Sequence, residues 1–111
     1  MTLVTIGYKL TASAGFSDTE TIYTVPSAQR FRLKRVVVTA PTGVDGQLSI
    51  VLQRGEFIIL PREGSIYPGP WVLEFYLDEE FSSGSEVKVT YHNEDTTNPH
   101  DCFIYLEGEL E

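Results

Sequence analysis

The stretch that decides the fold runs from Thr21 to Ala40 and reads Thr-Ile-Tyr-Thr-Val-Pro-Ser-Ala-Gln-Arg-Phe-Arg-Leu-Lys-Arg-Val-Val-Val-Thr-Ala. Residues 21–25 are rich in β-branched and aromatic side chains, which is typical of a strand. Pro26 ends that strand, because proline has no N–H to donate to a ladder. The chain then turns and extends again, with Phe31 and Leu33 on one face. The stretch therefore predicts two strands joined by a proline-led turn.

The second of these strands has a basic face, and its phase is ambiguous. Half of the eight basic residues of the chain lie in this strand or directly before it: Arg30, Arg32, Lys34 and Arg35. Alternation places the first three opposite the apolar face but puts Arg35 on that face, unless a β-bulge shifts the phase. The valine run that follows fits either a strand covered on both faces or such a bulge. Both interpretations stay open.

The basic stripe of Arg30, Arg32 and Lys34 has three interpretations. It is a solvated strand face balanced by nearby carboxylates, a contact for an acidic partner such as a second copy of this chain, or a site for phosphate or nucleic acid. The net charge of −8 argues against general nucleic-acid binding, because a phosphate backbone attracts a basic surface. The first two interpretations are therefore favoured.

The rest of the chain repeats a period-two pattern of apolar and polar residues, which indicates strands with one apolar face. The alternating segments cover residues 3–10, 48–53, 71–77, 87–92 and 102–110, and residues 57–60 are predicted to form a short apolar strand that Pro61 ends. Turn residues separate these segments, and the Asp45-Gly46 pair is typical of a hairpin turn. Residues 54–56 indicate a second tight reversal. Residues 78–85 indicate a polar loop around Phe81.

No helical period and no internal repeat accompanies these strands. We therefore expect residues 1–111 to form a single all-β domain, an antiparallel β-sandwich of about eight strands that is jelly-roll-like. An up-and-down barrel is the competing architecture.

No stretch matches a catalytic, metal-binding or nucleotide-binding motif. The single cysteine, Cys102, excludes an intrachain disulfide and is interpreted as a small buried apolar residue. His92, Asp95, His100 and Asp101 flank one polar loop and could hold a metal, but their spacing matches no standard zinc pattern, and solvated loop residues are the alternative. We expect no enzymatic activity and no cofactor.

The aromatic residues leave a binding function open. Trp71, Tyr67, Tyr76, Tyr91 and Tyr105 are enough to build a sugar-stacking platform of the kind found in carbohydrate-binding β-sandwiches. The alternative places Trp71 at the head of the apolar face of residues 71–77, in the core or in a subunit interface.

The N-terminal residues contain neither a basic leader nor a continuous apolar region, so we expect no signal peptide. No apolar run approaches the length that spans a membrane. We expect a protein made in the cytoplasm, without a membrane partner.

Residues 23–38 resemble an aromatic-x-Val-Pro-x-x-x-x-apolar pattern of small virion proteins of tailed bacterial and archaeal viruses. The similarity continues over residues 59–64, 69–75 and 104–109. This chain has Ser27-Ala28 where Ala-Gly is commoner in that pattern. The resemblance implies a jelly-roll head-decoration, head-fibre, tail-associated or receptor-binding module, often trimeric, and no functional residue carries over.

The sequence thus leads to one main expectation and one alternative. The main expectation is a non-enzymatic virion structural protein, a capsid-decoration or tail-associated module that assembles as a homotrimer and binds other virion proteins. Its partner-binding residues are predicted to be Arg30, Arg32, Lys34 and Trp71. The alternative is a module that binds a carbohydrate or a host receptor.

Overall fold

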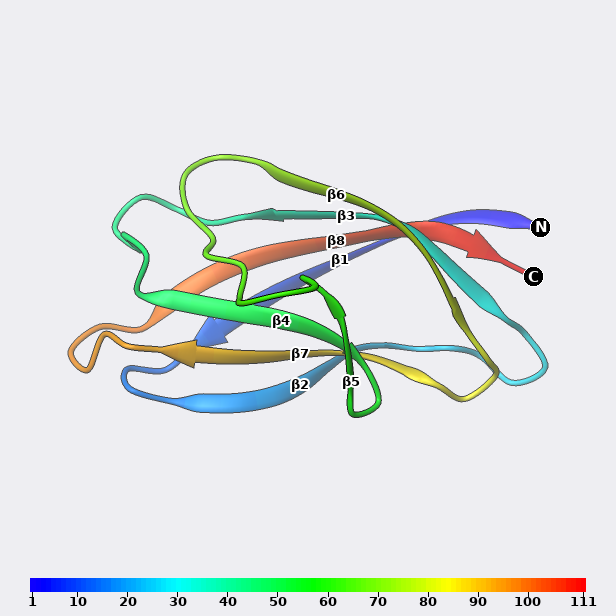
Figure 1. The fold of residues 1–111 in the computed structure, drawn as a ribbon, viewed down its shortest axis with the longest axis horizontal. Helices are drawn as coiled ribbons and strands as arrows, with labels where there is room; N and C mark the ends of the chain where they lie inside the picture. The colour runs from blue at the N-terminus through cyan, green and yellow to red at the C-terminus, as the bar shows by residue number, and fades with distance from the viewer.

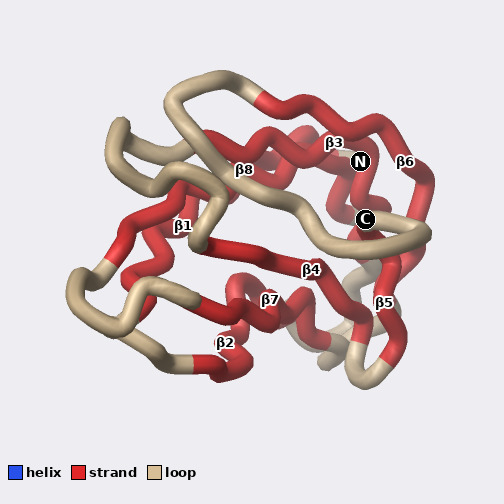
Figure 2. Tube along the Cα trace, turned by 60° about the vertical axis from the view of Figure 1, so that its left-hand side comes forward, coloured by secondary structure: helices blue, strands red, loops and turns tan.

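Two four-stranded antiparallel sheets face each other in the computed structural model, which describes residues 1–111 (Figure 1). The strands are β1 (Thr2–Ala12), β2 (Ser17–Thr24), β3 (Phe31–Thr39), β4 (Leu48–Arg54), β5 (Phe57–Leu60), β6 (Leu73–Phe81), β7 (Glu86–Asn93) and β8 (His100–Leu110). Figure 2 shows strands joined by loops, and no helix of the chain is long and apolar enough to cross a membrane.

The strand order identifies the topology. The first sheet has the order β1-β8-β3-β6 and the second has the order β2-β7-β4-β5. The chain crosses from sheet to sheet at every connection except the β4–β5 hairpin, which is the interleaving of an eight-stranded jelly roll. The prediction of an antiparallel β-sandwich of jelly-roll type is confirmed, and the barrel alternative is wrong.

The core lies between the two sheets and contains twenty buried apolar residues. Phe31 of β3 is fully buried in this core, with its ring centroid 5.2 Å from that of Tyr23 in an edge-to-face arrangement and 6.2 Å from that of Phe81. Such aromatic pairs add to the free energy gained from burial alone. Cys102 is fully buried in this core, as the sequence predicted.

A β-bulge at Lys34 and Arg35 determines the phase of β3. The register with both neighbouring strands shifts between Leu33 and Arg35. Lys34 and Arg35 both lie outside the core, while Leu33 and Val36 on either side of them are fully buried. A bulge adds one residue to a strand, so the side chains after it change phase. Of the two interpretations left open by the sequence, the β-bulge is confirmed.

One predicted turn is a hairpin and another is not. Arg54 pairs with Phe57 across a two-residue loop in which Gly55 has a φ of 60°, so residues 54–56 make the expected reversal. The Asp45-Gly46 turn lies in the segment that joins β3 of the first sheet to β4 of the second. The hairpin prediction for that pair is therefore wrong. Asp and Gly favour a local turn conformation, which is the same whether the next strand joins the same sheet or the other one.

The proline-led turn before β3 places Ala28 in the left-handed region, with a φ of 63°. Its amide donates a hydrogen bond to Ser83 Oγ at 2.9 Å, which holds the turn against the loop after β6. A residue with a Cβ atom in this region costs about 1–2 kcal/mol. This is the position at which the resembling pattern more commonly has glycine.

We expect Ala28→Gly to raise the free energy of unfolding by about 0.5 kcal/mol, because relief of the strain exceeds the extra entropy that glycine loses on folding. Urea denaturation measures this change. Ala14→Gly is the matched control, since Ala14 also lies in a turn but has an ordinary φ, and it should lower stability. An Ala28→Gly protein less stable than the wild type would contradict the strain argument.

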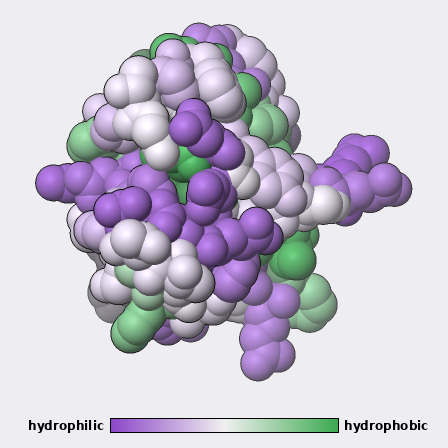
Figure 3. Space-filling view, turned by 90° about the vertical axis from the view of Figure 1, so that its left-hand side faces the viewer, coloured by the Kyte–Doolittle hydropathy of each residue, from purple (hydrophilic) through white to green (hydrophobic).

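The two ends of the sandwich differ. Both chain termini lie at one end, where the Arg30 and Glu111 backbones exchange two hydrogen bonds (Figure 1). The opposite end carries the loops 13–16, 40–47 and 94–99. Figure 3 looks onto that loop end and shows a mainly hydrophilic surface with scattered hydrophobic side chains.

Candidate functional site

The outward-facing residues of the first sheet form a surface that we call the charged face. Its central strand β3 is basic and the strands on both sides of it are acidic. The basic row consists of Arg32, Lys34 and Arg35. The acidic rows consist of Glu74, Asp78 and Glu80 on β6 and Asp101, Glu107 and Glu109 on β8. The sign of charge therefore alternates from strand to strand.

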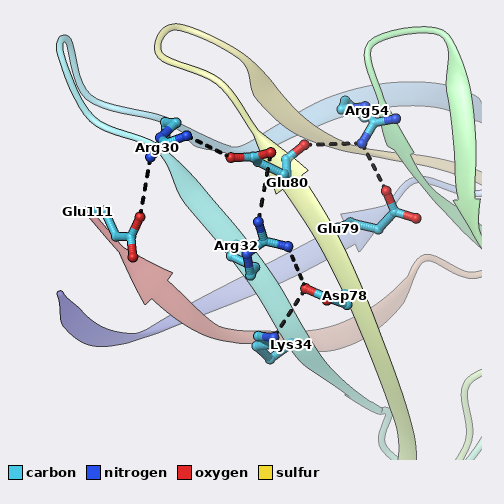
Figure 4. Close-up of polar contacts among 8 residues, drawn as sticks. All are labelled: Arg30, Arg32, Lys34, Arg54, Asp78, Glu79, Glu80 and Glu111. Atoms are coloured by element: carbon cyan, nitrogen blue, oxygen red, sulfur yellow. Dashed lines mark hydrogen bonds and ion pairs between the residues drawn. The ribbon is translucent and has the colours of Figure 1, made fainter.

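Every member of the predicted basic stripe pairs with a carboxylate of the same chain (Figure 4). Arg32 Nη1 donates to Asp78 Oδ1 at 2.9 Å, and Lys34 Nζ lies 3.1 Å from the same oxygen. These hydrogen bonds, with that of Arg32 the stronger, hold the pKa of Asp78 below its ordinary value. Arg30 lies 3.3 Å from Glu80 and 3.6 Å from Glu111. The geometry matches the interpretation of a balanced strand face, and partner binding by the stripe stays a prediction.

The prediction of a loop over residues 78–85 is wrong in its first half. Strand β6 continues through Glu80 to Phe81, which is fully buried. Glu80 lies directly opposite Arg32 in the register of β6 with β3. Three successive carboxylates disfavour a strand in isolation, but opposite charges on a neighbouring strand stabilise the pairing. The only trace of this in the sequence is the basic row of β3 itself.

Arg35 sits between two carboxylates that the sequence did not point to. Its Nη2 donates to Glu74 Oε1 at 2.9 Å, and its Nη1 donates to Glu107 Oε2. Its guanidinium carbon lies 5.9 Å from the centroid of the Tyr76 ring, and the Tyr76 hydroxyl donates to Glu74 at 3.1 Å. The Arg35 hydrogen bond holds the pKa of Glu74 below its ordinary value. These contacts depend on the bulge, which turns Arg35 outward.

The charged face also carries large apolar groups. Leu3 of β1 and Tyr76 of β6 are 75% and 74% exposed. The ring of Tyr105 lies against Gly7, where a Cβ atom would be 3.3 Å from Tyr105 Cε1. A groove of about 460 Å³ runs across the face, and its lining includes Leu3, Tyr76 and Glu107. The face thus combines paired charge with exposed hydrophobic surface.

Trp71 lies in the segment before β6 and outside the core, with 48% of its surface exposed. Its indole covers Gly69, where an added Cβ atom would be 2.6 Å from Cζ3 of the ring. Tyr67 in the same segment is 52% exposed, whereas Tyr91 is buried. Of the predicted aromatic platform, Tyr91 is therefore unavailable. The apolar face of β6 begins at Leu73 and not at Trp71.

The two open sides of the sandwich are each bridged by a polar contact between the sheets. Arg54 of the second sheet donates to Glu79 of β6 at 2.9 Å and lies over the ring of Phe81 at 5.8 Å. On the other side, Tyr8 of β1 donates to Glu20 of β2. Burial, together with this hydrogen bond, raises the pKa of Tyr8 to about 12. Both bridges hold the sheets together where core packing ends.

The loop between β7 and β8 is organised by Asp95. Its carboxylate accepts hydrogen bonds from the backbone amides of Thr97 and Asn98 and contacts His100 Nε2 at 2.9 Å. The Thr97 amide, followed by His100, lowers the pKa of Asp95 to about 2. His92 instead contacts Ser17 on β2. The four residues considered as metal ligands are thus divided, and no group of three or more His, Cys, Asp or Glu side chains is placed to hold an ion.

The lowered pKa of Asp95 predicts a window of acid sensitivity. A carboxyl group whose pKa is lower in the folded state stabilises the fold above its unfolded pKa, and this stability is lost as the pH falls toward the folded value. We expect the melting temperature to fall between about pH 4 and about pH 2, and Asp95→Asn to flatten that fall. Thermal melts across this range test it.

The control for this measurement is Asp45→Asn, because Asp45 is exposed and takes part in no ion pair or side-chain hydrogen bond. It should keep the acid sensitivity of the wild type. Equal slopes in the Asp95→Asn protein and the wild type would contradict the assignment.

Cys102 of β8 points into the core, and burial raises the pKa of its thiol to about 12. A thiol that stays protonated at neutral pH is a packing residue and a poor nucleophile. The interpretation of Cys102 as a small buried apolar residue is confirmed.

Comparison of the chain with models of protein families finds no match, and comparison with curated proteins finds none either. The features that bear on function are the charged face, the exposed aromatic residues of the segment 67–72, here called the Trp71 segment, and the resemblance of residues 23–38 to virion proteins.

Proposed function

We propose that this chain is a non-enzymatic structural protein of a virus particle that assembles with copies of itself and with other particle proteins. The observation that carries the proposal is the hydrophobic surface of the charged face, where Leu3 and Tyr76 are each about three-quarters exposed. Exposed apolar groups that line one groove, as Leu3 and Tyr76 do, mark a contact surface for another protein. The particle itself is suggested by the resemblance of residues 23–38 to virion proteins.

Self-assembly is tested by the mass of the purified protein in solution. Sedimentation equilibrium over micromolar to millimolar concentrations should give a mass well above the 12.5 kDa of one chain. A protein that stays monomeric at every concentration would contradict the proposal.

The location of the protein is tested separately, by probing purified virus particles with an antibody raised against the chain. Absence of the chain from the particles would contradict the viral part alone.

The Trp71 segment supports a second candidate function, the binding of a carbohydrate or a glycan receptor. Trp71 and Tyr67 are both about half exposed and lie four residues apart in one loop. Exposed aromatic rings of this kind stack on the apolar faces of sugars. Because Trp71 is the only tryptophan, quenching of its fluorescence by oligosaccharides reports binding directly. Spectra that do not change in millimolar sugar, together with an empty glycan array, would exclude this candidate.

A further inference from the structure

We propose that the charged face is the contact surface for a second copy of this chain, related to the first by a two-fold axis. The axis runs parallel to the strands, between β3 and β8. This inference rests on the proposed self-assembly and adds to it the surface, the symmetry and the residue pairs.

The alternation of charge across the sheet selects this axis. In the strand order β1-β8-β3-β6, rotation about a line between β8 and β3 lays β3 of one copy over β8 of the other. The basic row of each copy then faces an acidic row of its partner. A two-fold axis perpendicular to the strands would instead lay each row over a row of the same sign. Complementary potentials of this kind determine how two protein surfaces orient on each other.

The strand register gives the individual pairs. Arg32 lies level with Glu109 in the ladder of β3 with β8. A two-fold contact is isologous, so Arg32 of each copy faces Glu109 of the other and the pair occurs twice. Arg35 and Glu107 are level in the same way.

Glu109 is the carboxylate of the β8 row that has no cation within its own chain. Asp101 lies 3.7 Å from Lys9, and Glu107 pairs with Arg35. Arg32 already pairs with Asp78 at 2.9 Å through Nη1 and lies 3.8 Å from Glu80 through Nη2. A guanidinium has five N–H donors, so donors remain for a further carboxylate. In the dimer, Arg32 of one copy therefore supplies the cation that Glu109 of the other copy lacks within its own chain.

The same rotation covers the exposed apolar groups. Val37 lies level with Tyr105, so each faces the other across the contact. Tyr76 lies level with Arg35, Glu107 and Thr5 along successive strands, so it is carried over the partner's β1 edge beside Leu3. Tyr105 on β8 lies beside the proposed axis, and tyrosines near the centre of an interface commonly carry much of its binding energy.

The face is large enough for a specific contact. Nine residues of β3 span about 30 Å and four strands span about 19 Å, given a rise of roughly 3.3 Å per residue and a strand spacing of roughly 4.8 Å. The flat area of the face on each partner is then about 570 Å², or about 1,140 Å² for the pair, and protruding side chains add to it. That total clears the approximate minimum for a biological interface and lies at the small end of the range.

A mixing experiment tests the Arg32–Glu109 pair between copies. Arg32→Glu and Glu109→Arg each bring like charges together twice in their own dimers, so each alone should weaken self-association by roughly 100-fold. In a mixture, both contacts of the mixed dimer are attractive again. Its affinity should return to within roughly tenfold of the wild type, measured by sedimentation and native mass spectrometry.

Lys88→Glu is the matched charge control, because Lys88 lies on β7 of the other sheet. It should leave self-association unchanged. A mixture that associates no better than either variant alone would overturn the two-fold pairing. Circular dichroism and melting of each variant establish that the fold is intact.

A double variant tests the apolar part of the charged face without changing the charge of the protein. Leu3→Ser combined with Tyr76→Ser should reduce self-association by at least tenfold. Phe57→Ser, which removes an equally exposed side chain from β5 of the second sheet, should not. The inference would be overturned by a double variant that associates like the wild type or by a Phe57→Ser protein that dissociates. Either result would leave the proposed self-assembly uncontradicted.

The mass of the wild-type assembly adds a third test. The two-fold pairing requires a dimer or a multiple of dimers, whereas the resemblance to virion proteins implies a trimer. A trimer would overturn the two-fold pairing but support self-assembly. A strict monomer would overturn both.

Discussion

Gly108→Ala is expected to lower the free energy of unfolding by about 3 kcal/mol, as overpacking of a well-filled core does. Gly108 is buried in β8, level with Leu33 and beside the bulge. A Cβ atom there would lie 2.8 Å from Cε1 of Phe31 and closer still to the Arg32 carbonyl oxygen. A backbone oxygen cannot rotate away, so β3 and β8 would have to separate. Urea denaturation measures the loss.

Gly7→Ala is the matched control, since Gly7 lies in β1 of the same sheet and also has an ordinary φ. Its added Cβ atom would meet only the edge of the Tyr105 ring, at 3.3 Å. A flexible side chain can yield, so we expect a change within about 1 kcal/mol. Equal stability losses in the two proteins would mean that the close approach at Gly108 is not what requires glycine.

Asn93→Ala is expected to cost about 3 kcal/mol, because buried polar groups left without partners each cost about 1–3 kcal/mol. Asn93 is the one buried polar residue of the chain. Its Nδ2 donates to the carbonyl oxygens of Ala12 and Asn98 at 3.2 Å and 3.1 Å, and its Oδ1 accepts the amide of Asp95 at 3.0 Å. It therefore ties the β1–β2 turn to the loop before β8.

Asn98→Ala, in the same loop, is the control. The Asn98 side chain makes one exposed hydrogen bond, to Asp95 at 3.3 Å, so its loss should cost less than about 1 kcal/mol. The melting temperatures of the two variants compare them directly. Similar melting temperatures would show that the loop does not depend on the buried amide.

The fold was predictable from the sequence because alternation is a local property. Every second residue is apolar from Val4 to Leu10 in β1 and from Cys102 to Leu106 in β8, and these are the positions that face the core. The sequence does not show which sheet each strand joins, and for that reason the hairpin prediction for the Asp45-Gly46 turn is wrong. The phase of β3 was ambiguous because a bulge is determined by the two neighbouring strands and not by the bulged residues themselves.

The charged face was only half predictable. The basic row was visible because its residues alternate within one strand. Its acidic partners were not, since Asp78 and Glu80 are distant in sequence and their cluster resembled a solvated loop. The expectation that Trp71 heads the apolar face extends the alternation of β6 two residues beyond its true start, into residues 67–72, which contain two prolines and a glycine.

Because of the bulge, β3 contains one residue more than the ladders with β6 and β8 need. Loss of the codon for Arg35 would leave Phe31, Leu33, Val36 and Val38 facing inward and every other side chain facing outward. Loss of the next codon, for Val36, would turn Arg35 into the core. We therefore expect β3 to tolerate deletion of one residue at the bulge, because the remaining side chains keep their inward or outward positions and the surface loses only the cation of the deleted residue.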